Sequence, residues 1–194
     1  MTAFVLGNGI SRQAVSVPTL MQHGTVYGCN AIYREHEVHV LVATDHPIAN
    51  TIQRSGYSSQ HRFYTRRPVP DLGGLSIPAQ YFGFSSGPIA VGLAALDHQP
   101  RIYMLGFDLG PDETGRFNNV YAGTEFYKNV GAAPTFTGNW IKQILKILAD
   151  FPQQQFLRVC GPTTNSIKEF AVCSNYSEVM IEDFLDRINT LKDL

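Results

Sequence analysis

Short apolar runs alternate with polar turns and helix-like stretches along most of this chain of 194 residues. The runs are continuous rather than alternating, which is typical of strands buried on both faces of a parallel sheet. The runs expected to be strands are residues 3–6, 25–30, 37–43, 61–64, 101–105, 156–160 and 170–173. The pattern predicts one α/β domain over residues 1–194, Rossmann-like, with a mostly parallel sheet of about six or seven strands and helices on both faces.

Helix-like stretches separate these strands, recognised by apolar periodicity in the last two and by capping residues and an early proline in the first two. Helices are expected over residues 46–54, 89–96, 140–149 and about 178–191. Asp45 is expected to cap the first of them and Ser86 the second, because side-chain oxygens at this position accept from the free N–H groups of the first turn. Residues 66–78 are rich in proline and hold two adjacent glycines, so they are predicted to form a surface loop that could include a tight hairpin.

The stretch from residue 109 to residue 138 has no strong periodicity. It holds five glycines together with many aromatic and amide side chains. Long stretches without secondary structure are uncommon in compact domains unless they serve a function. We therefore expect a lid or substrate loop here, the alternative being a disordered excursion.

The first predicted strand runs directly into the turn Gly7-Asn8-Gly9-Ile10-Ser11-Arg12. Glycines permit a positive φ and leave no Cβ in the way, so backbone N–H groups could approach a ligand closely. Ser11 adds a hydroxyl and Arg12 a permanent cation, both suited to a phosphate. A turn after the first strand of an open α/β sheet is the usual place for a nucleotide phosphate. The alternative is a plain tight turn.

Polar residues follow other predicted strands in the same way. The full series is Asn8, Asn30, Asp45, Ser85, Ser86 and Asp108. In a doubly wound sheet the carboxyl ends of the strands share one edge, so these side chains are expected to converge on one cleft. Taken singly, each of them would equally suit a helix cap or an Asx-turn. The prediction of a binding site rests on the series.

Composition narrows the classes of function. The net charge of −1 gives no electrostatic reason to expect binding to nucleic acid or to a membrane surface. Arg62, Arg66 and Arg67 form a basic cluster that suits a solvated loop, an acidic acceptor or a subunit contact. The three cysteines lack metal-ligand spacing, which indicates buried thiols in a reducing compartment. With no N-terminal signal and no apolar run of membrane-spanning length, a cytoplasmic protein is expected.

The series of motifs resembles one superfamily. Gly7-Asn8-Gly9-x-Ser11, then Cys29-Asn30, then Ser86-Gly87 before an alanine-rich helix, then residues 102–108 match its order and spacing. Its members include the bacterial lipooligosaccharide sialyltransferases, which use CMP-sialic acid, and the MptE-like proteins, among them archaeal 6-hydroxymethylpterin pyrophosphokinases. Small phage-borne proteins also share the layout and the compact length, and for a phage protein the expected location is the host cytoplasm.

The resemblance implies roles for individual residues. It would place the nucleotide phosphate and sugar at Gly7, Asn8 and Gly9, and the nucleotide or the leaving group at Asn30. Ser86 and Gly87 would lie beside the cytidine. The resemblance therefore favours a nucleotide-dependent transferase, first of all a glycosyltransferase that uses a CMP-linked nucleotide sugar, with no cofactor indicated beyond the nucleotide itself.

The chain departs from the sialyltransferases in one respect. They carry a general-base histidine in the loop after the aspartate that matches Asp108, whereas none of the six histidines here lies in residues 109–138. Asp108 could orient a loop, accept from a hydroxyl or act as a base, and Tyr121 and Tyr127 could hydrogen-bond to a phosphate or leaving group. These three are the expected catalytic residues.

Two alternatives stay open. A pyrophosphokinase would need no strong base, could share Mg²⁺ between Asp45 and Asp108, and could use Arg12 on the phosphates. A noncatalytic nucleotide-binding protein would explain the missing histidine. Under all three interpretations the partner is a small-molecule nucleotide, and the aromatic residues within 117–136 would suit a homo-oligomer.

Overall fold

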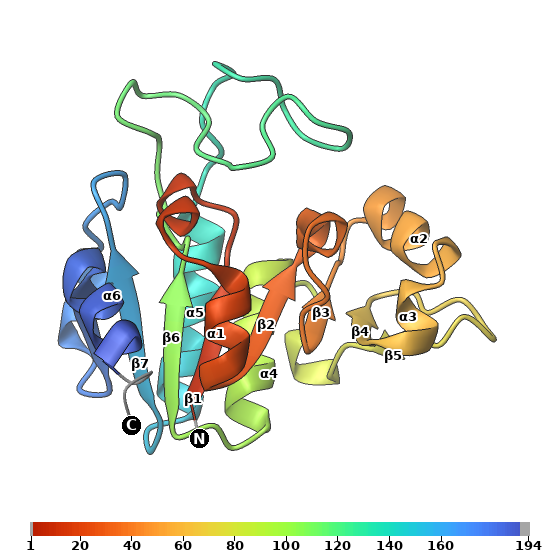
Figure 1. The fold of residues 1–194 in the computed structure, drawn as a ribbon, viewed down its shortest axis with the longest axis horizontal. Coiled ribbons are helices and arrows are strands. Elements are labelled where there is room, and N and C mark those ends of the chain that lie inside the picture. The colour runs from red at the N-terminus through yellow and green to blue at the C-terminus, as the bar shows by residue number, and fades with distance from the viewer. Residues whose placement is uncertain (1, 191–194) are drawn as a thin grey trace.

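The computed structural model describes residues 2–190. Its strands form one sheet, and every neighbouring pair is parallel. The strands are β1 (Thr2–Leu6), β2 (Thr25–Cys29), β3 (Val40–Val42), β4 (Arg62–Thr65), β5 (Leu75–Ser76), β6 (Arg101–Leu105), β7 (Gln155–Cys160) and β8 (Tyr176–Met180). The predicted Rossmann-like α/β fold is confirmed, with eight strands rather than the six or seven expected (Figure 1).

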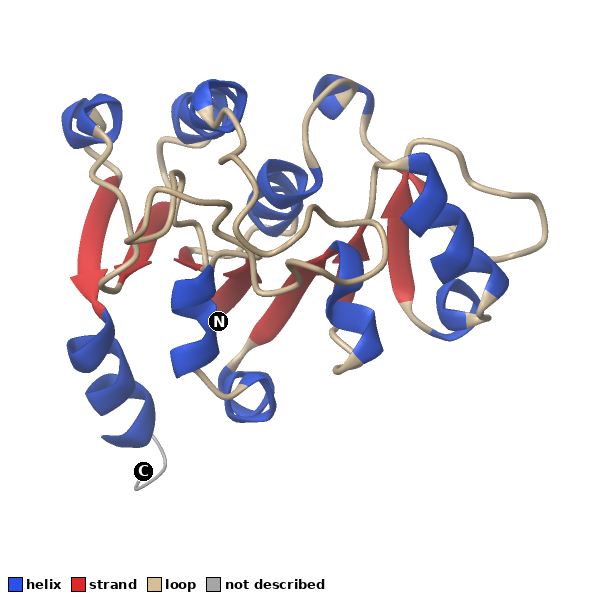
Figure 2. Ribbon diagram, turned by 90° about the horizontal axis from the view of Figure 1, so that it is seen from above, coloured by secondary structure: helices blue, strands red, loops and turns tan. Residues whose placement is uncertain are grey.

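Helices cover both faces of the sheet (Figure 2). On one face lie α1 (Val17–His23), α2 (His46–Arg54), α3 (Tyr57–Gln60) and α6 (Ile181–Thr190). On the other face lie α4 (Ser86–Leu96) and α5 (Gly138–Asp150). The described chain also holds short 3-10 helices at Ile10–Ala14, Asn30–Arg34, Ala79–Tyr81 and Lys168–Val172.

Successive residues of β1 show why the strands are unbroken apolar runs in the sequence. Ala3 and Val5 pack on the face covered by α4 and α5, whereas Phe4 and Leu6 pack on the opposite face. All four are almost inaccessible to solvent, because helices cover each face of the parallel sheet. Burial of this apolar surface is the main favourable contribution to folding.

The strand order β5-β4-β3-β2-β1-β6-β7-β8 puts the first strand in the middle of the sheet. The chain moves outward from β1 to β5, returns through α4 to the other side of β1, and continues from β6 to β8. Ala3 therefore pairs with Thr25 of β2 on one side and with Ile102 of β6 on the other. The carboxyl ends of β1 and β6 flank a topological switch point, which is where open α/β sheets bind ligands.

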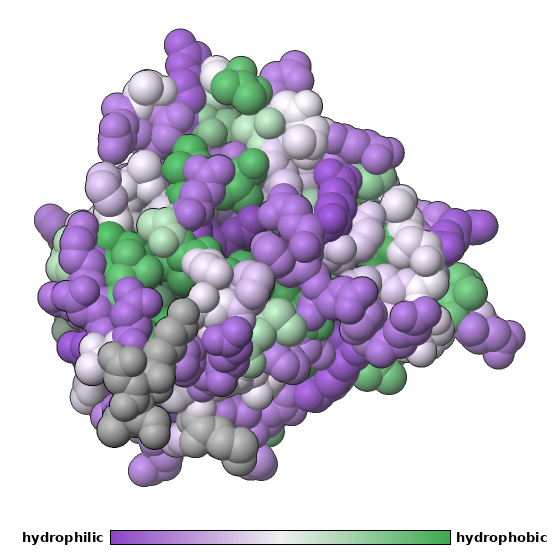
Figure 3. Space-filling model, viewed as in Figure 1, coloured by the Kyte–Doolittle hydropathy of each residue, from purple (hydrophilic) through white to green (hydrophobic). Residues whose placement is uncertain are grey.

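Residues 109–137 contain neither helix nor strand, and α5 follows them directly. Figure 1 shows these residues above the carboxyl ends of the strands, and we call them the lid segment. Its exposed apolar side chains include Phe126, Val130 and Phe136. Apolar residues accordingly show among hydrophilic ones at the top of the space-filling view (Figure 3). The predicted long loop is confirmed, whereas its role as a lid stays a prediction.

The last part of the chain differs from the prediction. Residues 170–173 lie in and directly after a 3-10 helix, so the strand predicted there was wrong, and the last strand is β8. In β8 only Val179 is buried, because β8 is an edge strand, so no apolar run marks it in the sequence. The last helix begins at Ile181 instead of near residue 178. Leu191, the last apolar position of the predicted helix, lies outside the described residues.

Other predicted elements differ in length or kind. The helix predicted over residues 46–54 has those bounds in the structure, whereas the strand predicted over 37–43 is limited to Val40–Val42. The 66–78 loop includes β5, which pairs in parallel with β4, so the tight hairpin is absent from this loop. Within residues 2–190, no helix is both long and apolar enough to span a bilayer.

Candidate functional site

A cavity of about 380 Å³, which we call the main cleft, opens at the carboxyl ends of the strands next to the lid segment. The predicted site residues that line it are Gly7, Asn8, Gly9, Asn30, Asp45, Ser85, Ser86, Gly87, Asp108 and Tyr127. Residues from both halves of the chain thus meet at one edge of the sheet, as the parallel topology predicts. Ser11, Arg12 and Tyr121 are not among the lining residues.

Arg12 lies beneath the first turn instead of facing a ligand. Its side chain is buried, and its guanidinium donates to the Gly7 carbonyl (3.3 Å), to Asn8 Oδ1 (3.2 Å) and to the Tyr121 hydroxyl (3.0 Å). The guanidinium carbon also lies 5.1 Å from the centre of the Tyr121 ring, a cation–π contact. Arg12 and Tyr121 therefore hold the lid segment against the first turn. The terminal nitrogens of Arg12 donate to protein acceptors, so the guanidinium is not available to a phosphate.

Asp108 organises the loops around the switch point. Its carboxylate accepts from the amide (3.1 Å) and the hydroxyl of Ser11, and from the hydroxyls of Thr163 (2.9 Å) and Thr164 (3.4 Å). Each carboxylate oxygen receives two of these hydrogen bonds, which occupies its two lone pairs. Ser11 is thus a structural partner of Asp108, and Asp108 has no lone pair left for a proton from a substrate.

A buried guanidinium supports the same loop from β7. Arg158 is fully buried and donates to the carbonyls of Phe107 (2.8 Å), Asp108 (3.2 Å) and Asn165 (2.7 Å). Its third nitrogen lies 3.4 Å from a carboxylate oxygen of Glu178. A buried charge is tolerated when its donors are satisfied in this way. The result is a rigid wall of the main cleft at Phe107 and Asp108.

The glycines of the first turn are required by packing between two loops. Gly9 has a φ of −64°, and Gly7 is likewise outside the positive-φ residues, so neither glycine uses the positive φ that glycine permits. A Cβ on Gly7 would lie 2.5 Å from the Gly106 carbonyl oxygen, and a Cβ on Gly9 would lie 2.5 Å from Asp108 Cγ. Any side chain at these positions would push the loops after β1 and β6 apart.

Most backbone donors of this turn are already engaged. The N–H groups of Gly7, Gly9, Ile10 and Ser11 all donate to protein acceptors, at 2.8–3.1 Å. The N–H of Asn8 donates to no residue within 2–190. The turn therefore offers one free backbone donor, which is too few to cradle a phosphate.

The start of α4 is built differently. Ser85, and not the predicted Ser86, is its N-cap residue. The Ser85 hydroxyl accepts from Trp140 Nε1 (2.9 Å) and the Ser86 hydroxyl accepts from the Thr44 amide (3.0 Å), so both hydroxyls serve the protein. The N–H groups of Ser86 and Gly87 find no acceptor among the described residues. They lie at the positive end of a helix of 11 residues, on the wall of the main cleft, and this arrangement binds anions.

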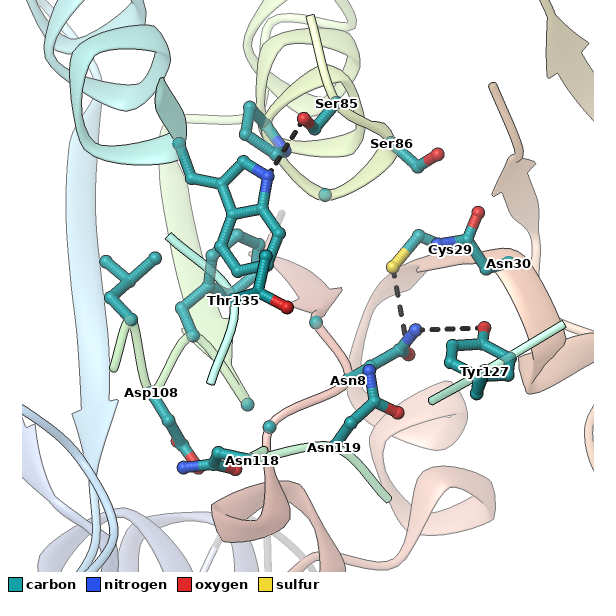
Figure 4. Close-up of a pocket in the computed structure, with 18 of the residues that line it drawn as sticks. Asn8, Cys29, Asn30, Ser85, Ser86, Asp108, Asn118, Asn119, Tyr127 and Thr135 are labelled. Carbon is teal, nitrogen blue, oxygen red and sulfur yellow. Dashed lines mark hydrogen bonds between the residues drawn. The ribbon is translucent and has the colours of Figure 1, made fainter. Parts of the chain in front are cut away.

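Amide side chains lie across the main cleft from the start of α4. Figure 4 shows Ser85 and Ser86 on one side of the opening. Asn8, Asn118 and Asn119 lie on the other side, the last two supplied by the lid segment. The amides of Asn8 and Asn118 are bonded to the protein at both ends, and Asn119 Oδ1 accepts from the Tyr121 amide. The Asn119 nitrogen donates to no described residue, so it can donate to the edge of a nucleobase or to a sugar hydroxyl.

Asn30 combines a left-handed backbone with an unsatisfied side chain. Its φ is +54°, a region that non-glycine residues rarely adopt and asparagine tolerates best. It lines the main cleft, and its Oδ1 is buried with no hydrogen-bond partner in the described part of the chain. A buried acceptor left in this state costs about 1–3 kcal/mol. A ligand that donates to Asn30 would recover that cost.

Neither of the two predicted catalytic tyrosines is suited to proton transfer. Burial raises the pKa of the Tyr127 hydroxyl, which accepts from the Ala31 amide at 3.3 Å. Burial likewise raises the pKa of Tyr121, outside the cleft. The neighbouring Cys29 thiol is also inert, because burial raises its pKa to about 12. Both hydroxyls and the thiol stay protonated at neutral pH.

Asp45 is the available carboxylate of the main cleft. The acidic residues among those lining it are Asp45 and Asp108. Asp45 is exposed and occupies the N-cap position of α2, yet its side chain makes no capping hydrogen bond. Its oxygens are therefore free to take up a proton or to orient a hydroxyl group.

A Mg²⁺ ion shared between Asp45 and Asp108 does not fit these residues. The four hydrogen bonds to Asp108 leave its oxygens no lone pair for a cation. Within residues 2–190, no group of three or more His, Cys, Asp or Glu side chains is placed to hold a metal ion. We derive no catalytic step through a metal ion bound by these side chains.

Several lining residues were not predicted. They include Thr44, Phe107, Asn118, Asn119, Lys128 and Trp140, with Arg66 known only as part of the basic cluster. Lys128 lies in the lid segment, where its ammonium is 3.2 Å from Thr135 Oγ1 and 5.4 Å from the Phe117 ring centre. The amide and aromatic content of residues 109–138 was the one sequence signal that pointed to this wall.

The lid segment is fastened to the rest of the cleft. The Val120 amide donates to the Asn8 carbonyl (2.8 Å), and Asn118 Oδ1 accepts from the Ile10 amide (2.8 Å). Farther along, the Arg34 guanidinium donates to Thr124 Oγ1 and to a lid carbonyl, each at 3.3 Å. The segment therefore forms one wall of the main cleft and is held in place by these hydrogen bonds.

Comparison with known proteins finds no matching family, no matching curated protein and no matching solved structure.

Proposed function

We propose that the main cleft binds a nucleotide and that the protein is a nucleotide-dependent transferase, with a CMP-linked nucleotide sugar as its donor class. The observation that carries the proposal is the pair of free N–H groups at Ser86 and Gly87, at the start of α4. They supply two backbone donors and a positive dipole end for the phosphate. Their place beside the topological switch point is the one that this type of fold uses for nucleotides.

The remaining walls suit the base and the sugar. The aromatic lining residues are Phe107, Phe117, Phe126, Tyr127 and Trp140. Aromatic faces stack on nucleobases, and the Asn119 side-chain nitrogen, which donates to no described residue, can donate to a base edge or to a hydroxyl. Asn30 Oδ1 would accept from an amino group such as that of cytosine. Arg66 and Lys128 add positive charge for the phosphate.

The transfer step would use Asp45 as the base. An acceptor hydroxyl oxygen would form a bond to the sugar carbon while the bond from that carbon to the phosphate oxygen breaks, its electron pair leaving with the nucleotide. The hydroxyl proton would pass to the Asp45 carboxylate. The dipole of α4 would stabilise the charge that develops on the departing phosphate.

The proposed phosphate site can be tested by placing a negative charge at position 87 and measuring nucleotide binding. A Cβ on Gly87 would lie 3.5 Å from Phe107, an ordinary contact, so a short side chain fits there. Gly87→Asp puts a carboxylate beside the proposed phosphate, whereas Gly87→Asn has nearly the same shape and no charge. We expect CMP and CDP to bind the asparagine variant with nearly wild-type affinity, and the aspartate variant about 10–100-fold more weakly, by isothermal calorimetry.

Equal binding to both variants, or no binding of CMP, CDP, UDP or ADP to the wild-type protein with or without Mg²⁺, would overturn the proposal. The aspartate variant should stay folded, because acidic residues in the first turn stabilise helices. Its thermal unfolding serves as the control.

A noncatalytic nucleotide-binding protein is the second candidate, favoured by the full hydrogen bonding of Asp108 and the raised pKa of both tyrosines. Release of CMP from CMP-linked sugars separates the two. The transferase proposal expects wild-type turnover and a loss of at least about 100-fold in Asp45→Asn, with CMP binding unchanged. Nucleotide binding with no turnover of any CMP-linked sugar by the wild-type protein would support the second candidate.

A further inference from the structure

A second cavity of about 210 Å³ lies beside the main cleft, and we call it the side pocket. It is bordered by the start of α2 and by the segment that follows β4. Thr44, Asp45 and Arg66 line both cavities, so the two share one rim. The remaining lining residues are His46, Ala49, Asn50, Gln53, Thr65, Arg67 and Val69.

Two cations dominate the side pocket. Arg66 donates to the Phe84 carbonyl at 2.7 Å, which holds its guanidinium near the shared rim. The Arg67 guanidinium makes no hydrogen bond or ion pair with any described residue. Against them stands one carboxylate, Asp45. Guanidinium groups with free donors are the side chains that bind phosphate and carboxylate.

The opposite wall adds backbone donors. α2 has nine residues, and the N–H groups of His46 and Ile48 in its first turn donate to no residue in the described range. Pro47 has no N–H, and Asp45 makes no side-chain cap. The positive end of α2 is thus open at the pocket that Arg66 and Arg67 border.

Thr65 gives an independent sign of a ligand. It is 1% exposed, it lines the side pocket, and its hydroxyl makes no hydrogen bond within residues 2–190. The buried Gln53 beside it is satisfied, since its Oε1 accepts from the Val69 amide at 2.7 Å. The hydroxyl therefore keeps its hydrogen for a ligand, and an oxygen of an anion in the pocket would accept from it.

We propose that the side pocket binds the anionic group, phosphate or carboxylate, of the acceptor substrate. This assignment rests on the proposed function of the main cleft. An acceptor anchored between Arg67 and the start of α2 would present its hydroxyl at the shared rim, beside Asp45 and next to the donor sugar. The acceptor class is therefore a hydroxyl compound that carries a phosphate or a carboxylate.

The test separates the two sites by variants. Inorganic phosphate and acetate are the probes, titrated by calorimetry into Gly87→Asp, in which the phosphate site of the main cleft is blocked. We expect one of the two anions to bind Gly87→Asp with nearly wild-type affinity. Adding Arg67→Gln should weaken that binding about 10–100-fold.

Two further variants show whether a loss of anion binding comes from the side pocket itself rather than from a general loss of positive charge. Arg101→Gln removes the same charge from an exposed residue at the amino end of β6, whereas the side pocket lies at the carboxyl ends of the strands. This variant should leave binding unchanged. Thr65→Val keeps the shape and removes the hydroxyl, and it should weaken binding about threefold or more without loss of thermal stability. Phosphate and acetate compared side by side decide which anionic group the pocket takes.

Each outcome decides the proposal. No binding of either anion to Gly87→Asp, or an equal loss with Arg67→Gln and Arg101→Gln, would overturn the side pocket as a site while nucleotide binding to the wild-type protein still supports the main cleft. Anion binding at the side pocket without any nucleotide binding would overturn the acceptor assignment together with the proposed function.

Discussion

Two regions have the sequence pattern of a phosphate site: the first turn, residues 7–12, and the start of α4. They differ in whether their N–H groups are already bonded to the protein. The turn after β1 is rich in glycine, but nearly all its N–H groups and the Arg12 guanidinium are bonded to the protein. The start of α4 holds the free N–H groups of Ser86 and Gly87. A glycine-rich turn in a sequence therefore does not show whether a ligand or another loop of the protein approaches the backbone closely.

Replacing a glycine in each region should give opposite results, and this is the largest effect we expect. Gly9→Ala would place a Cβ against Asp108 Cγ at 2.5 Å and the Gly106 carbonyl oxygen at 2.7 Å. We expect it to lower the free energy of unfolding by about 3 kcal/mol. Gly87→Ala meets only Phe107 at 3.5 Å and should be neutral or stabilising. Urea unfolding measures both; similar losses would contradict the comparison.

Substitution of the two aspartates of the main cleft should change the free energy of unfolding to different extents. Asp108→Asn replaces one acceptor oxygen by a donor among groups that already donate, so we expect a loss of about 2–3 kcal/mol in the free energy of unfolding. Asp45→Asn alters an exposed side chain with no capping bond and should change that energy by less than about 0.5 kcal/mol. Denaturant midpoints at neutral pH test this, and a large loss in Asp45→Asn would show that Asp45 is structural.

Asn30→Gly should raise stability and lower nucleotide affinity at once. Glycine adopts the φ of +54° without strain and removes the buried Oδ1 that has no described partner. We expect the free energy of unfolding to rise by about 0.5–1 kcal/mol and CMP to bind about tenfold more weakly. Asn30→Ala is the matched variant, since it removes the amide and keeps the strain. Unchanged CMP binding in both would remove Asn30 from the site.

Asp97 lies at the carboxyl end of α4, far from the main cleft, and its substitution should have the smallest effect on stability. It also serves as a control for nucleotide binding. Burial raises the pKa of Asp97, but hydrogen bonds from Arg62 and Tyr27 together outweigh it, so the folded pKa lies below the ordinary value. Stability from Asp97 is then complete above the unfolded pKa of about 4 and is lost as pH falls through the folded pKa.

Asp97→Asn should therefore cost about 1 kcal/mol at pH 7, after allowance for solvent screening, and nothing at a pH below the folded pKa. Thermal unfolding across this pH range measures the difference. CMP affinity should not change, because Asp97 lies outside the main cleft. A fall in affinity would mean that the start of α4 responds to disturbance along the whole helix.

The fold could be predicted where burial on two faces leaves an unbroken apolar run. β1, β6 and β7 are such strands. The bounds of α2 could be predicted because Asp45 suits an N-cap and Pro47 suits the first turn of a helix. β8 could not be predicted, because an edge strand with Val179 as its one buried residue has the local pattern of a loop. The strand order could not be read either, since it depends on pairings between distant residues such as Ala3 and Ile102.

The site was predictable in outline because strand ends meet at one edge. The roles within it were not, because they depend on neighbours that the sequence does not reveal. Arg12 is indistinguishable from a phosphate ligand until Tyr121 is found beside it, and Asp108 looks like a base until Ser11, Thr163 and Thr164 are seen to bond it. Lys128 reaches the cleft only through the path of the lid segment.

The central position of β1 also has a consequence for synthesis on the ribosome. β1 can pair with β2 early, but its other edge waits for β6, whose residues emerge about a hundred positions later. At ordinary elongation rates that interval lasts about 5–20 s. During this time the nascent chain carries an unpaired apolar edge, which is where association between growing chains would begin. Slower production, by limiting how many such chains coexist, should favour the correctly paired sheet.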